Sequence, residues 1–157
     1  MSSEWMGRYR PLVAALVRHG NMAINGVKHR DEVYDGVKLS PTEWQVLESV
    51  IEHQLEVVNM NALAGRMGLP QSTFSKTVSY LCAQGLVEKY QTANNKKNVI
   101  LKPTELALKV YETHSGVLEE YYFGSFFKVL EPLDDEAIGI VTRAIETLTG
   151  SILPAVE

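Results

Sequence analysis

The feature that most constrains the fold is a helical pattern that is divided by a glycine and a proline. In residues 59–84, apolar side chains recur at the three- and four-residue spacing of an amphipathic helix. Gly68 is suited to end a helix with a positive φ, and Pro70 is suited to begin the next one. The pattern therefore predicts a short helix and then a second helix from about Gln71 to about Gln84.

After Gly85 the hydrophobic period changes to the two-residue alternation of a strand. Residues 86–92 and 97–101 alternate apolar and polar side chains in part, and they flank Ala93-Asn94-Asn95-Lys96. Because asparagine tolerates the left-handed backbone of a tight turn, this stretch predicts a β-hairpin. Helix, turn, helix and hairpin in this order predict a winged helix-turn-helix.

The clearest helix start in the chain comes before this unit, at Ser40-Pro41-Thr42-Glu43. The serine can cap a backbone N–H, proline suits the first helical position, and the glutamate completes a capping box. Trp44, Leu47, Val50 and Ile51 then share one apolar face. We expect this helix to reach about Leu55.

The two ends of the chain are predicted to be helical as well. Residues 5–29 begin with helical spacing, residues 30–39 are expected to be a connection, and a helical pattern runs from Pro103 to about Leu130 with interruptions at Gly116 and Gly124. Asp134 is expected to cap a last helix. The predicted fold class is therefore mainly α with a small β-hairpin wing, a winged helix-turn-helix with appended N- and C-terminal helices.

Charge is distributed unevenly along the chain. The whole chain has a formal net charge of −4. Residues 59–102 contain six basic and one acidic side chain, a net +5, whereas residues 1–58 and 103–157 carry −2 and −7. A basic segment between acidic ends is typical of a protein in which one domain binds the phosphate backbone of a nucleic acid. Surface lysines can also cluster by chance.

The second helix of the motif is expected to present a polar face to DNA. With Phe74 at the centre of the buried face, a rotation of 100° per residue directs Ser72, Lys76 and Ser79 outward. Thr73 and Tyr80 flank them on one side and Ser75 on the other. Short hydroxyls let a helix approach base edges closely, and Lys76 can reach a guanine or a phosphate. Gln71 lies at the N-terminus of the helix, which favours phosphate oxygens.

The alternative for this helix is an ordinary solvated face. Serine and threonine are mediocre helix formers, so an exposed helix surface with no binding role more often contains Glu, Lys and Ala. This comparison favours a DNA-binding helix. In the hairpin, Asn95, Lys96 and Lys97 are the candidate DNA contacts, and a solvated turn is the competing interpretation.

Four stretches together resemble the MarR family of bacterial transcriptional regulators. They are Leu39–Leu47, Asn61–Leu69, Ser72–Lys76 and Gln84–Lys89, and the similarity in order and spacing extends over essentially the whole chain. The resemblance implies a homodimer on a palindromic site. It assigns residues 39–102 to DNA binding and residues 1–38 and 103–157 to helical dimerisation.

The resemblance also implies repression that is relieved by a small aromatic or lipophilic effector. A pocket between the DNA-binding part and the dimerisation helices would have Met22, Trp44, Leu47 and Tyr111 as candidate walls. Core packing is the competing role for each of these four residues.

The hairpin departs from the family pattern. The family usually has Asp-x-Arg in the wing, with the arginine in the minor groove, whereas this chain reads Thr92-Ala93-Asn94-Asn95-Lys96-Lys97-Asn98. We therefore assign only a DNA-backbone role to Lys96 and Lys97. The missing arginine keeps open a different class, a winged-helix module that binds protein without sequence-specific DNA binding.

An aromatic cluster in the C-terminal third has two interpretations. Five aromatic residues in seven cannot all lie on one side of a helix, so another element must cover some of them. A partner subunit is the favoured covering element, and packing within one subunit is the alternative. The cluster consists of Tyr121, Tyr122, Phe123, Phe126 and Phe127.

Other classes of protein have little support in the sequence. The chain lacks a phosphate loop, GxGxxG, GxSxG and HExxH, so we expect no enzyme and no cofactor. Its four histidines are scattered, which argues against a metal site, and Cys82 is expected to be a small core residue. No apolar run reaches membrane-span length and no signal peptide is evident, so a cytoplasmic location is expected.

Overall fold

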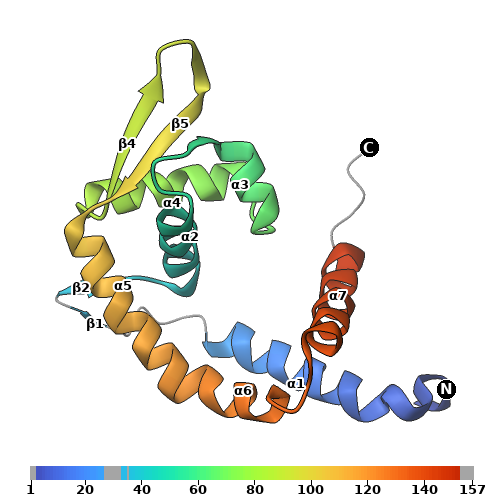
Figure 1. The fold of residues 1–157 in the computed structure, drawn as a ribbon. Coiled ribbons are helices and arrows are strands. Elements are labelled where there is room, and N and C mark those ends of the chain that lie inside the picture. Colours follow the sequence, from blue (N-terminus) through green and yellow to red (C-terminus); the bar gives the residue numbers. More distant parts are fainter. Residues whose placement is uncertain (1–2, 27–32, 35, 153–157) are drawn as a thin grey trace. The chain divides into compact units, whose positions relative to one another are not determined.

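The computed structural model describes residues 3–26, 33–34 and 36–152 (Figure 1). The predicted helix end at residues 27–29 and residues 30–32 and 35 of the predicted connection lie outside these ranges. The chain forms two compact units, residues 1–113 and residues 114–157. No described helix is long and apolar enough to cross a membrane.

The first unit contains the predicted winged helix-turn-helix. Its helices are η1 (Ser3–Tyr9), α1 (Arg10–Gly26), α2 (Pro41–Glu52), α3 (Met60–Arg66), α4 (Gln71–Ala83) and most of α5 (Glu105–Val117). Its strands are β1 (Val33–Tyr34), β2 (Val37–Lys38), β3 (Val57–Asn59), β4 (Val87–Thr92) and β5 (Asn95–Pro103). Figure 1 shows the β4–β5 hairpin extending beyond the helices of the motif. The predicted fold class is confirmed.

Helix α2 begins as predicted and ends earlier than predicted. The backbone N–H of Ser40 donates to Glu43 Oε2 at 2.7 Å, and the N–H of Glu43 donates to Ser40 Oγ at 3.3 Å, which completes the capping box. The helix ends at Glu52 with His53 as its C-cap rather than near Leu55. Leu55 has a φ of 67°, because the chain turns there to enter β3.

The sheet has three strands, one more than the hairpin alone supplies. Its order is β3-β5-β4, and Val58 pairs with Val99 in the antiparallel β3–β5 ladder. The hairpin turn is tighter than predicted: Thr92 pairs with Asn95, so the loop is Ala93–Asn94, and Asn95 already belongs to β5. The predicted connection at residues 30–39 also contains the short β1–β2 pair, in which Tyr34 opposes Val37.

The hydrophobic core lies within the helix-turn-helix and its sheet. Phe74, Val78 and Leu81 of α4 are completely buried in it. Gly68 and Gly85 have φ values of 65° and 70° and end α3 and α4 as the sequence predicts. The remaining core residues come from α2, α3, the sheet, α5 and the connections before α2 and β4: Leu39, Trp44, Val46, Leu47, Val50, Val58, Met60, Leu63, Ala64, Leu86, Val87, Val99, Leu101, Ala107 and Val110.

The second unit continues the helical stretch with one irregular turn. After α5 come the π-helix η2 (Leu118–Phe123), α6 (Gly124–Leu130) and α7 (Asp135–Ile152). Gly124 lies where η2 meets α6, and a Cβ atom there would lie 2.6 Å from the Glu119 carbonyl oxygen. The glycine therefore permits the wide turn. Asp134 Oδ1 accepts the Ala137 N–H at 2.8 Å, so the predicted cap of the last helix is confirmed.

Candidate nucleic-acid interface

Helix α4 has one buried face and one polar face. Phe74, Val78 and Leu81 anchor it in the core, while Ser72, Lys76 and Ser79 are exposed. This division agrees with the predicted orientation of the helix. Of the other predicted contacts on α4, Gln71 is exposed, whereas Thr73, Ser75 and Tyr80 are half-buried. Tyr80 also packs against the core, so its ring supports the helix as well as flanking the polar face.

Two hydrogen bonds organise the polar face of α4. Gln71 Nε2 donates to Ser75 Oγ at 3.0 Å, and Ser79 Oγ donates to the Ser75 carbonyl oxygen at 3.0 Å. Because the Ser79 hydroxyl donates its hydrogen to the helix, it presents lone pairs outward and can accept from a base amino group. Gln71 lies along the first turn, close to the backbone N–H groups that the helix leaves free there.

Of the three predicted DNA contacts in the wing, the structure describes the side chain of one. Asn95 is exposed in β5, and its carbonyl oxygen accepts from Thr92 Oγ1 at 2.8 Å, which holds the hairpin turn together. The backbones of Lys96 and Lys97 belong to β5, but their side chains lie outside the described residues.

Strand β4 has two exposed side chains that the sequence does not predict as DNA contacts. Lys89 is exposed on β4, a strand that contacts α4. Burial raises the pKa of the Cys82 thiol on α4, and the positive charge of Lys89 partly offsets that rise. Tyr90 is also exposed, and its hydroxyl donates to Glu88 Oε2 at 2.7 Å, which raises the pKa of the tyrosine. The net charge of residues 59–102 includes Lys89, but charge counting could not place it beside α4.

Cys82 is half-buried and packs against the core. Burial raises the pKa of its thiol, and this effect outweighs the opposing influence of Lys89. A raised pKa keeps the thiol protonated, which makes it a poor nucleophile. The environment agrees with the predicted packing role.

The four candidate effector contacts have different surroundings. Trp44 and Leu47 are buried in the core, and Met22 is 69% exposed on α1. Tyr111 on α5 is half-buried, and its hydroxyl donates to Glu48 Oε1 at 2.5 Å. Burial, together with this hydrogen bond, raises the pKa of the tyrosine. The shared role of the four residues remains a prediction.

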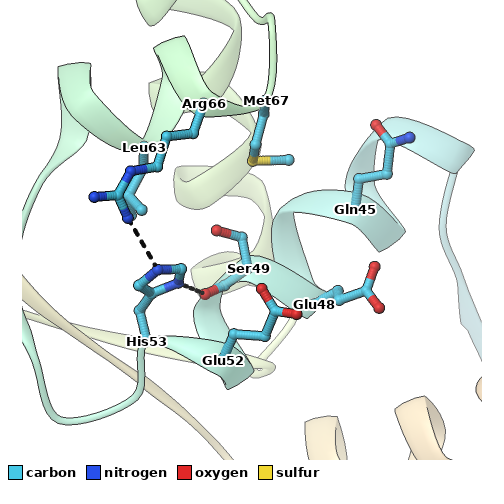
Figure 2. Close-up of a pocket in the computed structure, with 8 residues that line it drawn as sticks. All are labelled: Gln45, Glu48, Ser49, Glu52, His53, Leu63, Arg66 and Met67. Atoms are coloured by element: carbon cyan, nitrogen blue, oxygen red, sulfur yellow. Dashed lines mark hydrogen bonds between the residues drawn. The ribbon is translucent and has the colours of Figure 1, made fainter. Parts of the chain in front are cut away.

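A pocket of about 440 Å³ lies instead between α2 and α3 (Figure 2). None of the predicted effector contacts lines it. Its walls are mostly polar or charged, and in the part of the chain that the structure describes no three His, Cys, Asp or Glu side chains are grouped to hold a metal. The lining residues are Gln45, Glu48, Ser49, Glu52, His53, Leu63, Arg66 and Met67.

Comparisons with known proteins agree with this geometry. Residues 37–97 match the model of the MarR family. Among curated proteins, the HTH-type transcriptional regulator PchR of Bacillus subtilis (strain 168) is 23% identical over 111 residues. That match covers 71% of this chain and 64% of PchR, so the chain spans less than two thirds of that relative.

Solved structures similar to this chain cover nearly its full length. The zinc-responsive MarR family member ZitR from Lactococcus lactis is 18% identical with a TM-score of 0.59, covering 92% of this chain and 99% of ZitR. A ZitR mutant in complex with DNA is 19% identical with a TM-score of 0.62, over 94% and 99% of the two chains. PcaV of Streptomyces coelicolor, with its natural ligand, is 16% identical with a TM-score of 0.61, over 98% and 99%. At these identities the likeness establishes the fold.

Proposed function

We propose that the chain is a homodimeric repressor of the MarR type that binds a palindromic operator through α4. The match of residues 37–97 to the MarR family model supports this proposal. The observation that carries this proposal is the polar face of α4. It combines short hydroxyls with one lysine and is backed by completely buried Phe74, Val78 and Leu81. A helix of this kind can enter the major groove, where the pattern of donors and acceptors is distinct for each base pair.

Each part of the face has a chemical task in this proposal. Ser72 and Ser79 approach base edges, and Lys76 donates to a guanine edge or to a phosphate. Gln71 and the first turn of α4 hold a phosphate. Asn95, Lys96 and Lys97 of the wing contact the backbone, which fixes orientation without reading sequence.

Exposed apolar side chains on the terminal helices support the homodimer. Leu12 and Val17 of α1 are more than half exposed, as are Val129 of α6 and Ile140 of α7. Apolar side chains that repeat along a helix without burial mark a surface that a partner covers. We assign these faces, with the aromatic cluster of η2 and α6, to the second subunit.

The proposal includes control by a small aromatic or lipophilic effector with Met22, Trp44, Leu47 and Tyr111 as contacts. PcaV, solved with its natural ligand, and the zinc-responsive ZitR are structurally similar proteins. Thermal shift measurements with aromatic carboxylic acids test this part. Stabilisation that disappears in Tyr111→Ala supports it, and no stabilisation by any such acid contradicts it.

Selection of binding sites from genomic fragments tests the DNA-binding proposal. The full-length protein is expected to enrich an inverted repeat whose half-sites are about one helical turn apart, roughly 34 Å, because a two-fold dimer presents two recognition helices to one face of DNA. The affinity for that site is expected to fall steeply with salt as counterions are released. Failure to enrich any repeat would contradict the proposal and favour a protein-binding module.

A further inference from the structure

The pocket between α2 and α3 has groups of opposite charge on its walls (Figure 2). Glu48 and Glu52 of α2 supply carboxylates, and Arg66 at the end of α3 supplies a guanidinium. Among the residues that the structure describes, no ion pair joins Arg66 to either glutamate. Opposite charges that share a pocket without pairing remain available to a ligand that carries both signs.

The positive side of the pocket is organised by a histidine. His53 Nδ1 lies 2.8 Å from the Ser49 carbonyl oxygen, and Arg66 Nη1 lies 3.3 Å from His53 Nε2. Both contacts are satisfied when Nδ1 carries the hydrogen and Nε2 accepts from Arg66. His53 therefore orients the guanidinium and uses one of its five N–H groups, and the other N–H groups can bind a carboxylate in the planar, two-pronged manner of arginine.

The negative side is organised by α2 and α5. Tyr111 donates a hydrogen bond to Glu48 and holds that carboxylate at the edge of the pocket. The Glu52 side chain makes no hydrogen bond in the described structure, and Figure 2 shows it on the α2 side of the pocket. Glu52 is one helical turn from Glu48, so the two carboxylates lie on the same side of α2. An ammonium group placed here can donate to Glu52 while Glu48 adds to the negative potential.

The floor of the pocket is partly apolar. Leu63 is buried and Met67 is half-buried, and both line the pocket. A volume of about 440 Å³ is within the range of small-molecule sites. From the charges, the floor and the size we propose that this pocket binds a small zwitterion, an aliphatic molecule with a carboxylate that Arg66 binds and an ammonium group that Glu52 binds. This ligand differs from the lipophilic effector of the proposed function, and its binding does not depend on that function.

Isothermal titration calorimetry of the full-length protein without DNA tests the proposal. The probes are the zwitterions glycine, 4-aminobutyrate and 6-aminohexanoate. Hexanoate lacks the ammonium group and hexylamine lacks the carboxylate, so they serve as matched controls for the longest probe. At least one zwitterion is expected to bind in the millimolar range or tighter. Hexanoate and hexylamine are each expected to bind about tenfold more weakly than 6-aminohexanoate, because each loses one charge-assisted contact.

Two variants locate the binding to this pocket. Glu52→Gln and Arg66→Gln are each expected to weaken binding by about tenfold, because each removes one charged contact. Glu52→Gln disturbs no hydrogen bond of the described structure, so its effect reports on the ligand rather than on folding. Glu56→Gln, an exposed change outside the pocket, is the charge-matched control and should leave the affinity unchanged.

The results that would overturn the proposal are equally specific. If none of the three zwitterions gives a binding heat at ligand concentrations up to about 50-fold above a Kd of ~1 mM, the pocket does not bind this class of ligand. Equal binding of 6-aminohexanoate and hexylamine would show that Arg66 does not select a carboxylate. Binding that survives in Glu52→Gln and Arg66→Gln would place the ligand elsewhere. None of these results bears on operator selection, which tests the proposed function separately.

Discussion

The helix-turn-helix and the terminal helices use apolar side chains in opposite ways. In the former, apolar residues from α2, α3, α4 and the sheet bury one another, and Phe74 has no exposed surface. In α6 no described residue is buried, and Val129 is 75% exposed. The first region therefore has a hydrophobic core of its own, whereas the apolar faces of α1, α6 and α7 need a further surface to cover them.

This contrast shows why patterning alone does not report burial. Helical spacing of apolar residues is as regular in α7 as in α4, yet Phe74 of α4 is buried and Ile140 of α7 is 54% exposed. A pattern shows which face of a helix must be covered, but it does not show whether the cover comes from the same chain. The predictions below separate stability that arises within one chain from stability that requires association.

The largest effect is expected for Phe74→Ala. Removing a completely buried phenylalanine should lower the free energy of unfolding by about 3–5 kcal/mol, because it leaves a cavity in the core. Urea denaturation followed by circular dichroism measures the change. Phe127→Ala is the matched control, because Phe127 is 53% exposed and stacks on Phe123 with ring centroids 5.7 Å apart. If Phe127→Ala lowers the free energy of unfolding by more than ~1 kcal/mol at concentrations where the chain is monomeric, the two regions do not differ in burial as described.

The second effect concerns association. Leu148→Asp on α7 places a charge on an exposed apolar face and is expected to weaken the proposed dimer by more than ~2 kcal/mol, or about 30-fold in Kd. Analytical ultracentrifugation over a concentration series measures it. Glu146→Asp on the same helix introduces the same residue without removing an apolar side chain, so it should dimerise normally. Equal dimerisation of the two variants would exclude the α7 face from the interface.

The smallest effect concerns the start of α2. Ser40→Ala removes the hydroxyl that accepts the Glu43 N–H and should cost about 1 kcal/mol of stability. Thermal unfolding under monomeric conditions detects a loss of this size. Ser125→Ala on α6 removes an exposed hydroxyl that makes no capping hydrogen bond, so it should leave the melting temperature nearly unchanged. A loss below ~0.3 kcal/mol in Ser40→Ala would mean that the rest of the capping box compensates.

Local signals explain which parts of the fold were predictable. The capping box of α2 and the glycines that end α3 and α4 act through their immediate neighbours, so the sequence reveals them directly. Strand β3 is three residues long and becomes a strand only by pairing with β5, about 40 positions later. No local period could have revealed it, and the early end of α2 follows from the same strand.

The same reasoning applies to the sites. The polar face of α4 could be predicted because helical geometry alone separates Ser72 and Lys76 from Phe74. The α2–α3 pocket could not, because the contact between His53 and Arg66 joins residues 13 positions apart and depends on how two helices pack. Lys89 was counted as part of a basic segment, but only the fold places it beside α4.

The most direct test of the central claim, that α4 reads DNA, compares Lys76→Ala with Lys128→Ala. Lys76 is exposed on α4, and Lys128 is exposed on α6, so both variants lose one surface charge. Fluorescence anisotropy with the selected operator should show about tenfold weaker binding for Lys76→Ala, with relaxed preference at one position of each half-site if the lysine reads a base. Lys128→Ala should bind like the unaltered protein. Equal affinity of the two variants would contradict the assignment of α4 as the recognition helix.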